Sequence, residues 1–438
     1  MAHNVDVDRR FFEPAIETAA RAEITSWQER RILELVPYVW DRSPFYRELW
    51  SAADVDPSDI RSLDDFTAKI PTFSKSDLRA YRERTGDPFA GLLCVEPVEL
   101  TSITSTSGTT SLPEPLPEVW DIAPPLPMMT ARALWEIGLR PGDRVLIPSG
   151  TFRNYWDGLF RTLGLVPVFT DSWIGQGEQI LRSIKRHNIA YLQLFLPTVM
   201  EFEALEAKYD IGDMLSSLKG AAFAGQPLGA ALAHKVRDDW GVNLFTYTSA
   251  GDTGLAWESS DHDGYHLQED TMFPEFLDPL TDAPVADGEV GELVATDLDN
   301  PAAPYIRFRS EDLVRVSRAP APCGRTHARM WVLGRVGDEI RVAGKALVLA
   351  DIWRHVEELP ECSDALFQVV KHAVEMESLR IRIGYAPDRT VDIEDLHKRV
   401  TIQLENGLGV TVDAELLTVE KILESSTSVA KFPRTVKA

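Results

Sequence analysis

The spacing of apolar residues predicts helices over about the first hundred positions. The stretch "AARAEITSWQERRILELVPYVWDRSPFYRELW" repeats apolar residues at intervals of three and four, as one buried face of a helix requires. The stretches "SLDDF" and "SKSDLRAY" each place an acidic residue three positions after a serine, which is typical of a capped helix start. The chain is therefore predicted to begin with a group of helices.

From Arg144 onward, short apolar runs alternate with amphipathic stretches. The runs "DRVLIPS", "VPVFTDS", "IAYLQLFLP" and "VNLFTYTS" have the length and composition of strands, whereas "EQILRSIKRHN" and "ALAHKVRDDWG" have helical periodicity. Alternation of this kind is typical of parallel strands joined by helices. We therefore predict a layered α/β fold for this part of the chain.

After about Glu269 the pattern changes to turn-rich β segments such as "GEVGELVATDL" and "YIRFRSEDLVRVS". From Val348 helical and strand patterns alternate again to the end of the chain, as expected for a small α+β domain. The predicted fold class is α/β: a large N-terminal layered α/β domain over residues 1–336, and a small mobile α+β domain over residues 337–438.

Composition excludes several classes of function. The formal charge of −23, from 68 acidic and 45 basic residues among 438, argues against nucleic-acid binding and against adhesion to anionic membranes. Three scattered cysteines do not make a disulfide framework, and the start "MAHNVDVDRRFFEP" has no apolar signal core. No apolar run approaches the roughly 20 residues of a membrane helix. We expect a cytoplasmic protein without a membrane span.

The stretch "TSITSTSGTT", Thr101–Thr110, is the first candidate for chemistry. Backbone N–H groups of a glycine-bearing loop, together with Ser and Thr hydroxyls, can bind phosphate oxygens. The loop has no lysine, so it is not a Walker site. Taken alone, the pattern fits an ordinary polar surface loop equally well.

The neighbouring motifs favour the phosphate-binding interpretation. The stretch "STSGTTSLPEP" is similar to the phosphate loop of adenylate-forming enzymes, and "ARALWEIGLRPGDRVLIP" follows it as in that family. The chain resembles the phenylacetate-CoA ligase branch from Ile32 to its C-terminus. The resemblance implies nucleotide contacts from the loop residues Ser105, Thr106, Ser107, Gly108, Thr109 and Thr110.

Two further motifs carry the implied nucleotide site. The stretch "AFAGQPLG" resembles the turn that flanks the adenine, with Gln226 in place of the family's glutamate, and "LFTYTSAGDTGLAWES" stands at the family's aromatic-Gly-x-Thr-Glu motif. Depending on a one-residue gap, Ser249 or Asp252 occupies the position that binds Mg²⁺; we favour Asp252, because a carboxylate oxygen is the usual ligand. The implied nucleotide contacts in these motifs are Gly225, Gln226, Pro227, Phe245, Tyr247, Thr248 and Ser249.

The later motifs imply a ribose anchor, a hinge and a catalytic lysine. "YIRFRSEDLVRV" resembles the segment whose aspartate binds the ribose hydroxyls, which assigns that role to Asp312. "VLGRVGDEIRVAGKALVL" is similar to the hinge segment, with Arg335 on ribose or phosphate and Gly337 and Asp338 at the pivot. Lys431, in "STSVAKFPRTVKA", matches the lysine that enters the site for adenylation.

The sequence offers fewer candidate residues for the acyl-substrate pocket and for bound metal ions. Tyr155, Trp156 and Ala224 are the candidate walls of an acyl pocket. Some relatives hold a structural zinc; the corresponding positions here are Ser259, His266, Ala321 and Cys323. Because a closed zinc site needs four N or S ligands, we predict no zinc.

The resemblance implies an AMP-forming acid–thiol ligase that uses ATP, Mg²⁺ and coenzyme A. A carboxylic acid, of aromatic type by the branch, is first joined to AMP and then to the thiol. Two alternatives stay open at this point: an adenylating enzyme that passes the acyl group to an amine or a carrier protein, and a degenerate homologue without catalysis. A homodimer is the default oligomeric state.

Overall fold

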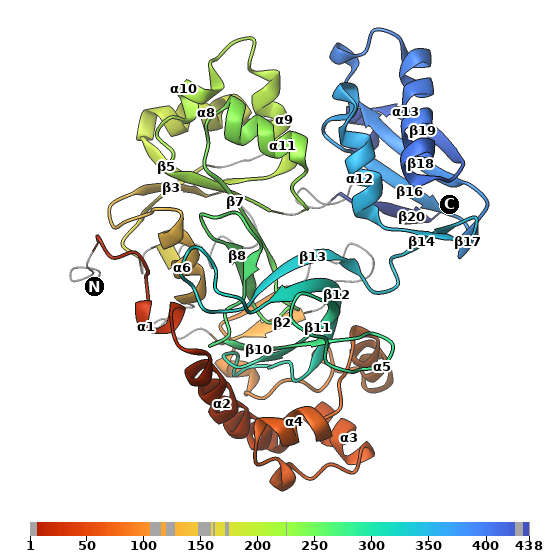
Figure 1. The fold of residues 1–438 in the computed structure, drawn as a ribbon. Helices are drawn as coiled ribbons and strands as arrows, with labels where there is room; N and C mark the ends of the chain where they lie inside the picture. The colour runs from red at the N-terminus through yellow and green to blue at the C-terminus, as the bar shows by residue number, and fades with distance from the viewer. Residues whose placement is uncertain are drawn as a thin grey trace. The chain divides into compact units, whose positions relative to one another are not determined.

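The computed structural model describes residues 7–105, 115–119, 128–147, 159–160, 163–170, 175–224, 226–424 and 432–437. The chain forms two compact units (Figure 1). Unit 1 contains Met1–Phe169 and Tyr247–Leu333, and unit 2 contains Thr170–Thr246 and Gly334–Ala438. The boundary between the units at Leu333/Gly334 therefore lies three residues before the predicted domain boundary at 336/337. Unit 2 also takes in residues 170–246, whose helix α11 contacts the C-terminal helix α12, Leu349–Glu357. The two-domain division of the sequence stays a prediction.

Helices form the N-terminal part of unit 1. Their bounds are α1 Pro14–Glu17, α2 Arg21–Arg42, α3 Pro44–Ala52, α4 Leu63–Lys69, α5 Lys75–Thr85 and α6 Met128–Glu136. Helix α2 buries Ile24, Ile32, Val36 and Val39 along one face, as the periodicity predicts. The predicted caps are confirmed as well: the Ser62 hydroxyl accepts a hydrogen bond from the Asp65 amide at 3.1 Å, and the Ser74 amide donates to the Asp77 carboxylate at 2.7 Å.

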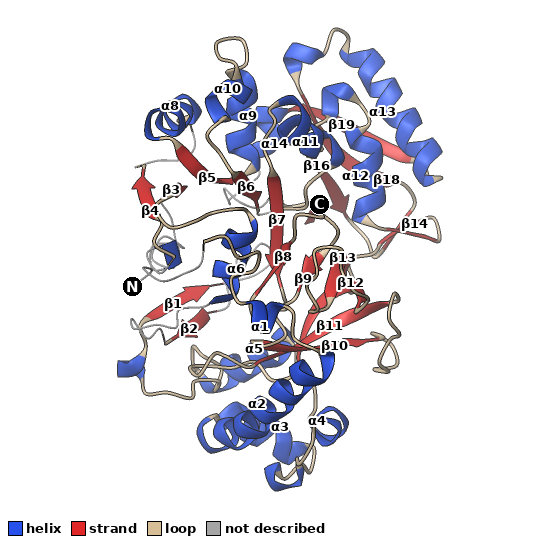
Figure 2. Cartoon of the chain, turned by 60° about the vertical axis from the view of Figure 1, so that its left-hand side comes forward, coloured by secondary structure: helices blue, strands red, loops and turns tan. Residues whose placement is uncertain are grey.

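An aromatic cluster fixes these helices to the strands of unit 1. Tyr46, Trp50, Phe73 and Phe308 belong to one buried core. The Tyr46 hydroxyl donates to the Pro304 carbonyl at 2.8 Å and accepts from the Ile306 amide at 2.9 Å, so this buried polar group is satisfied on both sides. Figure 2 shows α2, α3 and α4 gathered on one side of β10 and β11.

Strands make up the rest of unit 1. They run in the spatial order β10 (Met272–Leu277), β11 (Val290–Asp297), β12 (Phe308–Ser317), β13 (Arg329–Arg335), β9 (Tyr265–His266), β8 (Leu255–Glu258) and β7 (Leu244–Ser249). Strands β3 (Arg144–Ile147) and β4 (Val166–Phe169) pair in parallel, and β1 (Ser102–Ser105) and β2 (Pro115–Glu118) form an antiparallel hairpin. The predicted turn-rich β region is therefore confirmed.

Unit 2 begins with the strand–helix alternation that the sequence predicts. Strands β5 (Ile189–Leu194), β6 (Gly220–Phe223) and β7 pair in parallel. Its first helices are α8 Gly177–His187, α9 Leu196–Ala204, α10 Ile211–Leu215 and α11 Ala230–His234. Every residue of β5 is buried, as expected for a parallel strand covered on both faces.

The C-terminal part of unit 2 has its own core. Its elements are β14 Ile340–Val342, β15 Lys345–Leu347, α12, β16 Phe367–Lys371, β17 Glu375–Met376, β18 Leu379–Tyr385, α13 Ile393–Leu408, β19 Val412–Thr418, α14 Val419–Leu423 and β20 Thr435–Lys437. Helices α12 and α13 pack together beside a four-stranded sheet in the order β19-β18-β16-β20. The predicted fold class, α/β with an α+β segment at the C-terminus, is confirmed.

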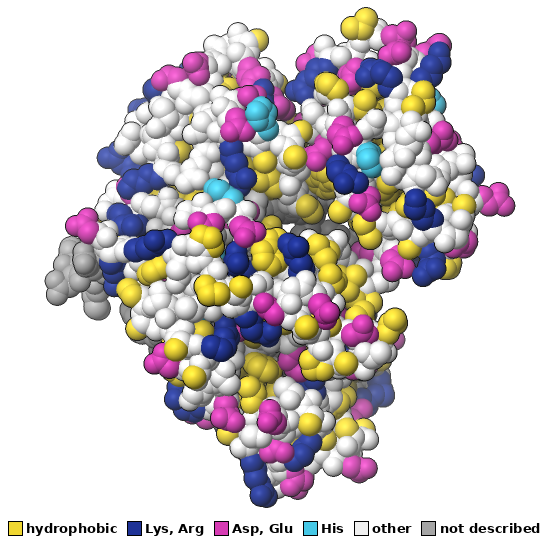
Figure 3. Space-filling view, viewed as in Figure 1, with side chains coloured by type: hydrophobic (Ala, Val, Ile, Leu, Met, Phe, Trp, Pro, Cys, Tyr) yellow, Lys and Arg dark blue, Asp and Glu magenta, His cyan; other side chains and the backbone are white. Residues whose placement is uncertain are grey.

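Charges of both signs are interspersed over the face drawn in Figure 3. The acidic excess is therefore not gathered into one patch on this face. Within the described ranges, no helix combines the length and the apolar composition that crossing a membrane requires.

Candidate active site

The hairpin β1–β2 carries the predicted phosphate loop between its strands. Ser105, the last residue of β1, pairs with Pro115, the first residue of β2. The predicted contacts Thr106, Ser107, Gly108, Thr109 and Thr110 lie outside the described residues. The chain therefore leaves β1 and enters β2 at two paired positions.

The turn between β7 and β8 carries the predicted metal and aromatic positions. Tyr247 and Trp257 are paired across the two strands, and their rings are stacked with centroids 4.4 Å apart. At the tip, the Asp252 amide donates to the Ser249 hydroxyl at 3.1 Å, and Asp252 has a φ of 56°. Ser249 and Asp252, the two alternatives for the metal position, thus lie at one turn and contact each other.

Gly251 brings this turn against β11 and β12. A Cβ atom at Gly251 would lie 2.9 Å from the Cβ of Ala295 and 3.4 Å from the Cβ of Ser310. A side chain would therefore push the turn away from the sheet. Because Ser310 is two residues from Asp312, the close approach places the Asp252 turn beside the predicted ribose anchor.

A β-bulge presents Asp312. The register between β11 and β12 shifts between Glu292 and Val294, and Glu311 has a φ of 65°. The Ser310 hydroxyl donates to the Leu293 carbonyl at 2.8 Å and accepts from the Asp312 amide at 3.0 Å. Bulges change the direction of a side chain and are common beside active sites. The irregular backbone at Asp312 is therefore held by specific hydrogen bonds.

Sequence reasoning missed Lys75, which pairs with Asp252. The Lys75 Nζ lies 2.8 Å from the Asp252 Oδ2, and both side chains are about four-fifths buried, with exposed fractions of 19% and 20%. Lys75 is the first residue of α5, far from Asp252 in sequence. The stretch Thr101–Thr110 has no lysine, whereas α5 places one beside Asp252. The capped start at Ser74 was the only sequence signal that marked this position.

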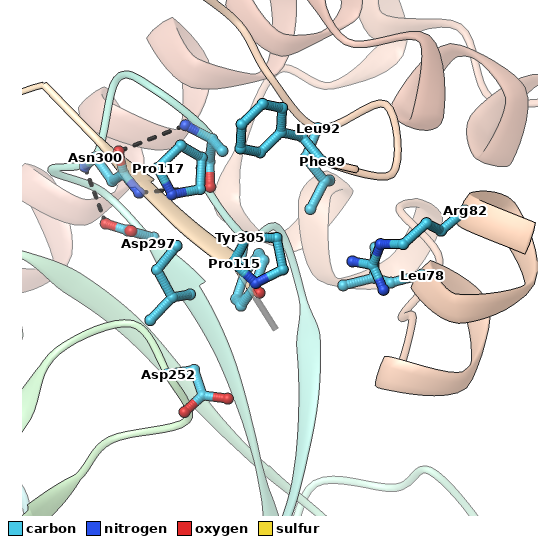
Figure 4. Close-up of a pocket in the computed structure, with 12 residues that line it drawn as sticks. Leu78, Arg82, Phe89, Leu92, Pro115, Pro117, Asp252, Asp297, Asn300 and Tyr305 are labelled. Carbon is cyan, nitrogen blue, oxygen red and sulfur yellow. Dashed lines mark hydrogen bonds between the residues drawn. The ribbon is translucent and has the colours of Figure 1, made fainter. Parts of the chain in front are cut away.

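A small pocket lies beside Asp252 (Figure 4). Its walls include Leu78 and Arg82 of α5, Pro115 of β2, and the acidic residues Asp252 and Asp297. Since Pro115 is the residue at which the chain returns from the phosphate loop, the pocket adjoins the predicted nucleotide site.

Asp297, at the end of β11, is buried in the wall of this pocket. Its carboxylate accepts hydrogen bonds from the amides of Asp299 and Asn300 at 3.0 and 3.1 Å. Burial raises the pKa of Asp297 from 3.8 to about 7, and these amides only partly oppose the rise. The carboxyl group thus stays protonated in the folded protein over a range in which the unfolded chain is ionised.

We expect the stability of the protein to fall as the pH rises from about 4 to 7, because the unfolded state then releases a proton that folded Asp297 keeps. The full effect, present above pH 7, is at most about 4 kcal/mol. Asp297→Asn keeps the acceptor oxygen and removes the ionisation. It should raise the melting temperature at pH 8 relative to wild type and have little effect at pH 4.5. Exposed Asp41→Asn is the control; equal shifts at both pH values would contradict the assignment.

The predicted adenine turn lies in unit 2 at the end of β6. Ala224 is buried, and its amide donates to the Leu194 carbonyl at 3.3 Å, while Pro227 is exposed. The Gln226 Oε1 accepts a hydrogen bond from the guanidinium of Arg434 at 3.1 Å. Gly225 lies outside the described residues. On β7, Phe245 is fully buried and Thr248 partly buried.

The predicted hinge lies at a change of unit. Arg335 ends β13, two residues after Leu333, the last residue of unit 1. Gly334 and Gly337 have φ values of 157° and 80°, and the Asp338 amide donates to the Arg335 carbonyl at 3.2 Å. Glycine is the residue that adopts such backbone angles at little cost. Lys431, Tyr155 and Trp156 lie outside the described residues, so their roles stay predictions.

The positions that resemble a zinc site form a different cluster. His266 Nε2 lies 3.4 Å from Cys323 Sγ in the core, and burial and the charges of Arg325 and Arg329 lower the pKa of His266 to about 3. Beside them, Arg325 forms ion pairs of 2.8 Å with Glu17 and Glu136. Buried cations so close to His266 do not fit a zinc ion at this place.

A magnesium ion needs fewer protein ligands than a structural zinc ion does. It commonly takes one or two carboxylates and completes its shell with phosphate oxygens and water. Within the described ranges, no three His, Cys, Asp or Glu side chains are grouped so that they could hold a metal by themselves. Lys75 pairs with the Oδ2 of Asp252, which leaves the Oδ1, with the Ser249 hydroxyl 3.4 Å away, for an ion that arrives with a nucleotide.

The chain is similar to known proteins over most of its length. A phenylacetate-coenzyme A ligase of Thermus thermophilus is 27% identical to the chain and aligns over 93% of the chain and 95% of the relative. No protein-family model matches the chain.

Solved structures share the fold. A 2-hydroxyisobutyryl-CoA ligase in the postadenylation state, in complex with 2-HIB-AMP, superimposes with a TM-score of 0.84 at 23% identity, covering 100% of this chain and 94% of that chain. The same ligase with 2-HIB-AMP and CoA, in the thioesterification state, gives a TM-score of 0.69 at 23% identity, with the same coverage. The fold predicted from the motifs, and the resemblance that predicted it, are confirmed.

Proposed function

We propose that this chain, a homologue of phenylacetate-coenzyme A ligases with the fold of 2-hydroxyisobutyryl-CoA ligase, is an AMP-forming acid–thiol ligase. It activates a carboxylic acid with ATP to an acyl-AMP and transfers the acyl group to coenzyme A. The proposal rests on one observation: the similarity to a named ligase extends over 93% of this chain and 95% of that ligase.

The chemistry has two balanced steps. A carboxylate is a poor acyl donor because its leaving group would be oxide, so its oxygen first attacks the α-phosphorus of ATP and pyrophosphate leaves. The thiolate of coenzyme A then attacks the acyl carbon, and AMP leaves with the electrons of the broken C–O bond. The first step places negative charge on the α-phosphate oxygens, and fixed cations stabilise that charge.

Each described residue of the site has a separate role in binding the nucleotide or stabilising its charge. Asp312, presented by the bulge of β12, binds the ribose hydroxyls, and Tyr247 lies against the base. Asp252 would hold Mg²⁺, which when bound neutralises phosphate charge. Lys75, 2.8 Å from Asp252, brings a second cation to the same turn and offsets the absence of a lysine from the phosphate loop.

The finer substrate assignments rest on the sequence. We propose an aromatic acid with Tyr155 and Trp156 in its pocket, coenzyme A rather than a carrier protein as acceptor, and a cytoplasmic location. The buried free thiols Cys94, Cys323 and Cys362 support the location, because none is paired in a disulfide. Rotation of the C-terminal segment about Gly337 would switch the active site from acyl-AMP formation to thioester formation.

Asp312→Ala should weaken ATP binding by about 10- to 100-fold, the loss expected for charge-assisted hydrogen bonds to two hydroxyls. Isothermal titration calorimetry measures the affinity directly. Glu311→Gln is the control, because it changes the adjacent acid and keeps a long side chain at a φ of 65°. Equal affinities of wild type and Asp312→Ala would remove Asp312 from the ribose site.

Product analysis tests the proposed function. The protein is incubated with ATP, Mg²⁺, coenzyme A and single carboxylic acids, and products are identified by mass. We expect one AMP and one acyl-CoA per ATP consumed for the cognate acid, and neither product when acid or ATP is omitted. Acyl-AMP that accumulates and is not consumed by coenzyme A would contradict the thiol-ligase assignment.

A further inference from the structure

The segment that leads into α5 holds Lys75 at a fixed place beside β12. Just before the helix, the Phe73 amide donates to the Arg307 carbonyl at 3.3 Å, and the Phe73 carbonyl accepts from the Arg309 amide at 2.8 Å. The Phe73 side chain is buried in the aromatic core. Since Lys75 follows this anchor by only two residues, its backbone has little freedom to move away from the strand.

The Asp252 turn is fixed against the same part of unit 1. A Cβ atom at Gly251 would lie 2.9 Å from the Cβ of Ala295, so the turn rests directly on β11. Asp252 has a φ of 56°, a conformation that persists only where the surrounding structure holds it, and its amide donates to the Ser249 hydroxyl. The 2.8 Å contact between Lys75 and Asp252 therefore joins two anchored segments.

Lys75 stands where a helix disfavours a cation. It is the first residue of α5, and the N-terminus of a helix carries a partial positive charge. The capping box of Ser74 and Asp77 completes the start of the helix without it. Helix formation therefore does not account for a lysine at this position, whereas the ion pair with Asp252 does.

The ion pair balances the charge of Asp252 and engages one of its two oxygens. The Lys75 Nζ contacts the Oδ2, while the Oδ1 lies 3.4 Å from the Ser249 hydroxyl, and Asp252 lines the small pocket. Asp297 lines the same pocket, but its carboxylate accepts two backbone amides. The turn thus offers a cation one carboxylate oxygen and one hydroxyl, in a pair whose net charge is zero.

This charge balance distinguishes between two forms of Mg²⁺. A free dication would meet the carboxylate and the lysine ammonium together, and a like charge a few ångströms away opposes its binding. Mg²⁺ that is bound to ATP brings phosphate oxygens with it, and the same ammonium attracts their negative charge. Lys75 is therefore unfavourable to the free ion and favourable to the nucleotide complex.

We propose that Lys75 makes the metal position at Asp252 selective for Mg²⁺ that is already bound to the nucleotide, by excluding the free ion and attracting the phosphates. Lys75 is then a specificity-determining residue. The inference rests on the proposed function, and it adds that the metal joins the site together with ATP and not before it.

Metal binding without nucleotide tests this selectivity. Mn²⁺, which takes the same oxygen ligands as Mg²⁺, is titrated into the protein and followed by electron paramagnetic resonance. Lys75→Met should bind one Mn²⁺ about 10-fold more tightly than wild type, because the opposing charge is gone. Adding Asp252→Asn should remove this ion. Lys75→Gln, which is neutral but can still donate to Asp252, should behave as Lys75→Met does, and Lys75→Arg should behave as wild type.

Lys69→Met is the matched control for this experiment. The Lys69 Nζ lies 2.7 Å from the Asp65 Oδ1 on α4, so this variant also leaves a carboxylate without its lysine, away from the site. It should bind Mn²⁺ no more tightly than wild type. Thermal melting verifies that each variant folds.

Calorimetric titration with Mg²⁺ and ATP together measures the attraction of the phosphates. Lys75→Met should weaken binding of the complex about 10-fold, and Lys75→Arg by no more than about 3-fold.

Two results would overturn the selectivity: Lys75→Met that binds Mn²⁺ no more tightly than its double variant with Asp252→Asn, or Lys75→Met that keeps the wild-type affinity for the Mg²⁺–ATP complex. Either result in a protein that forms acyl-AMP rejects the role of Lys75 alone. The expected binding in a protein that forms no acyl-AMP with any acid rejects the proposed function alone, because neither measurement needs turnover.

Discussion

Replacing Lys431 with alanine should slow acyl-AMP formation by about two to three orders of magnitude, because a positioned cation stabilises the charge that develops at the α-phosphate. Thioester formation from preformed acyl-AMP should stay within a few-fold of wild type, since that step develops no such charge. The contrast between the two half-reactions is the signature of the role that the sequence assigns to Lys431.

Separate assays of the two steps measure this contrast. ATP–pyrophosphate exchange reports the first step, and the release of AMP from purified acyl-AMP and coenzyme A reports the second. Lys421→Ala, an exposed lysine of α14, is the control and should leave both rates unchanged. Equal losses in both steps for Lys431→Ala would contradict a specific role in adenylation.

Replacing Arg307 with methionine should lower the free energy of unfolding by about 3–5 kcal/mol, the cost of leaving a buried charge without its partner. The Arg307 guanidinium makes two bonds with the buried Glu275, at 2.8 and 2.9 Å. It also donates to the carbonyl of Thr67 at 2.7 Å and to that of Ile70. Arg307 thus joins the end of α4 to β10 and β12.

Chemical denaturation followed by tryptophan fluorescence measures this loss. Changing both partners, Arg307→Met with Glu275→Met, should recover most of the stability, because no unpaired charge then remains. Arg341→Met, at the exposed pair with Glu339, should change it by less than about 1 kcal/mol. A loss below about 1 kcal/mol for Arg307→Met would show that the buried pair contributes little.

Local patterns predicted the elements well. The periodicity of α2 and the serine caps at Ser62 and Ser74 depend on residues within one or two turns of each other, so the sequence displays them directly. The alternation of strands and helices likewise predicted the parallel strands β5 and β6. For the same reason, the motif of β12 located Asp312 on a strand.

The contacts that build the site join residues far apart in the chain, and no local pattern contains them. Lys75 contacts Asp252 because α5 packs beside the turn between β7 and β8. Gln226 contacts Arg434, which lies 208 residues further along the chain. The bulge that presents Asp312 depends on the register between β11 and β12, which the motif does not specify. The neutral Gln226, which stands in place of the family's glutamate, is the partner of a buried cation.

Acid-dependent ATP–pyrophosphate exchange tests most directly whether this chain joins a carboxylic acid to AMP. The assay is run with Mg²⁺ over a panel of aromatic and short aliphatic acids. We predict exchange that requires the acid, is strongest for one chemical class of acids, and is lost in Lys431→Ala. A folded protein that binds ATP and shows no exchange with any acid in the panel would contradict the account.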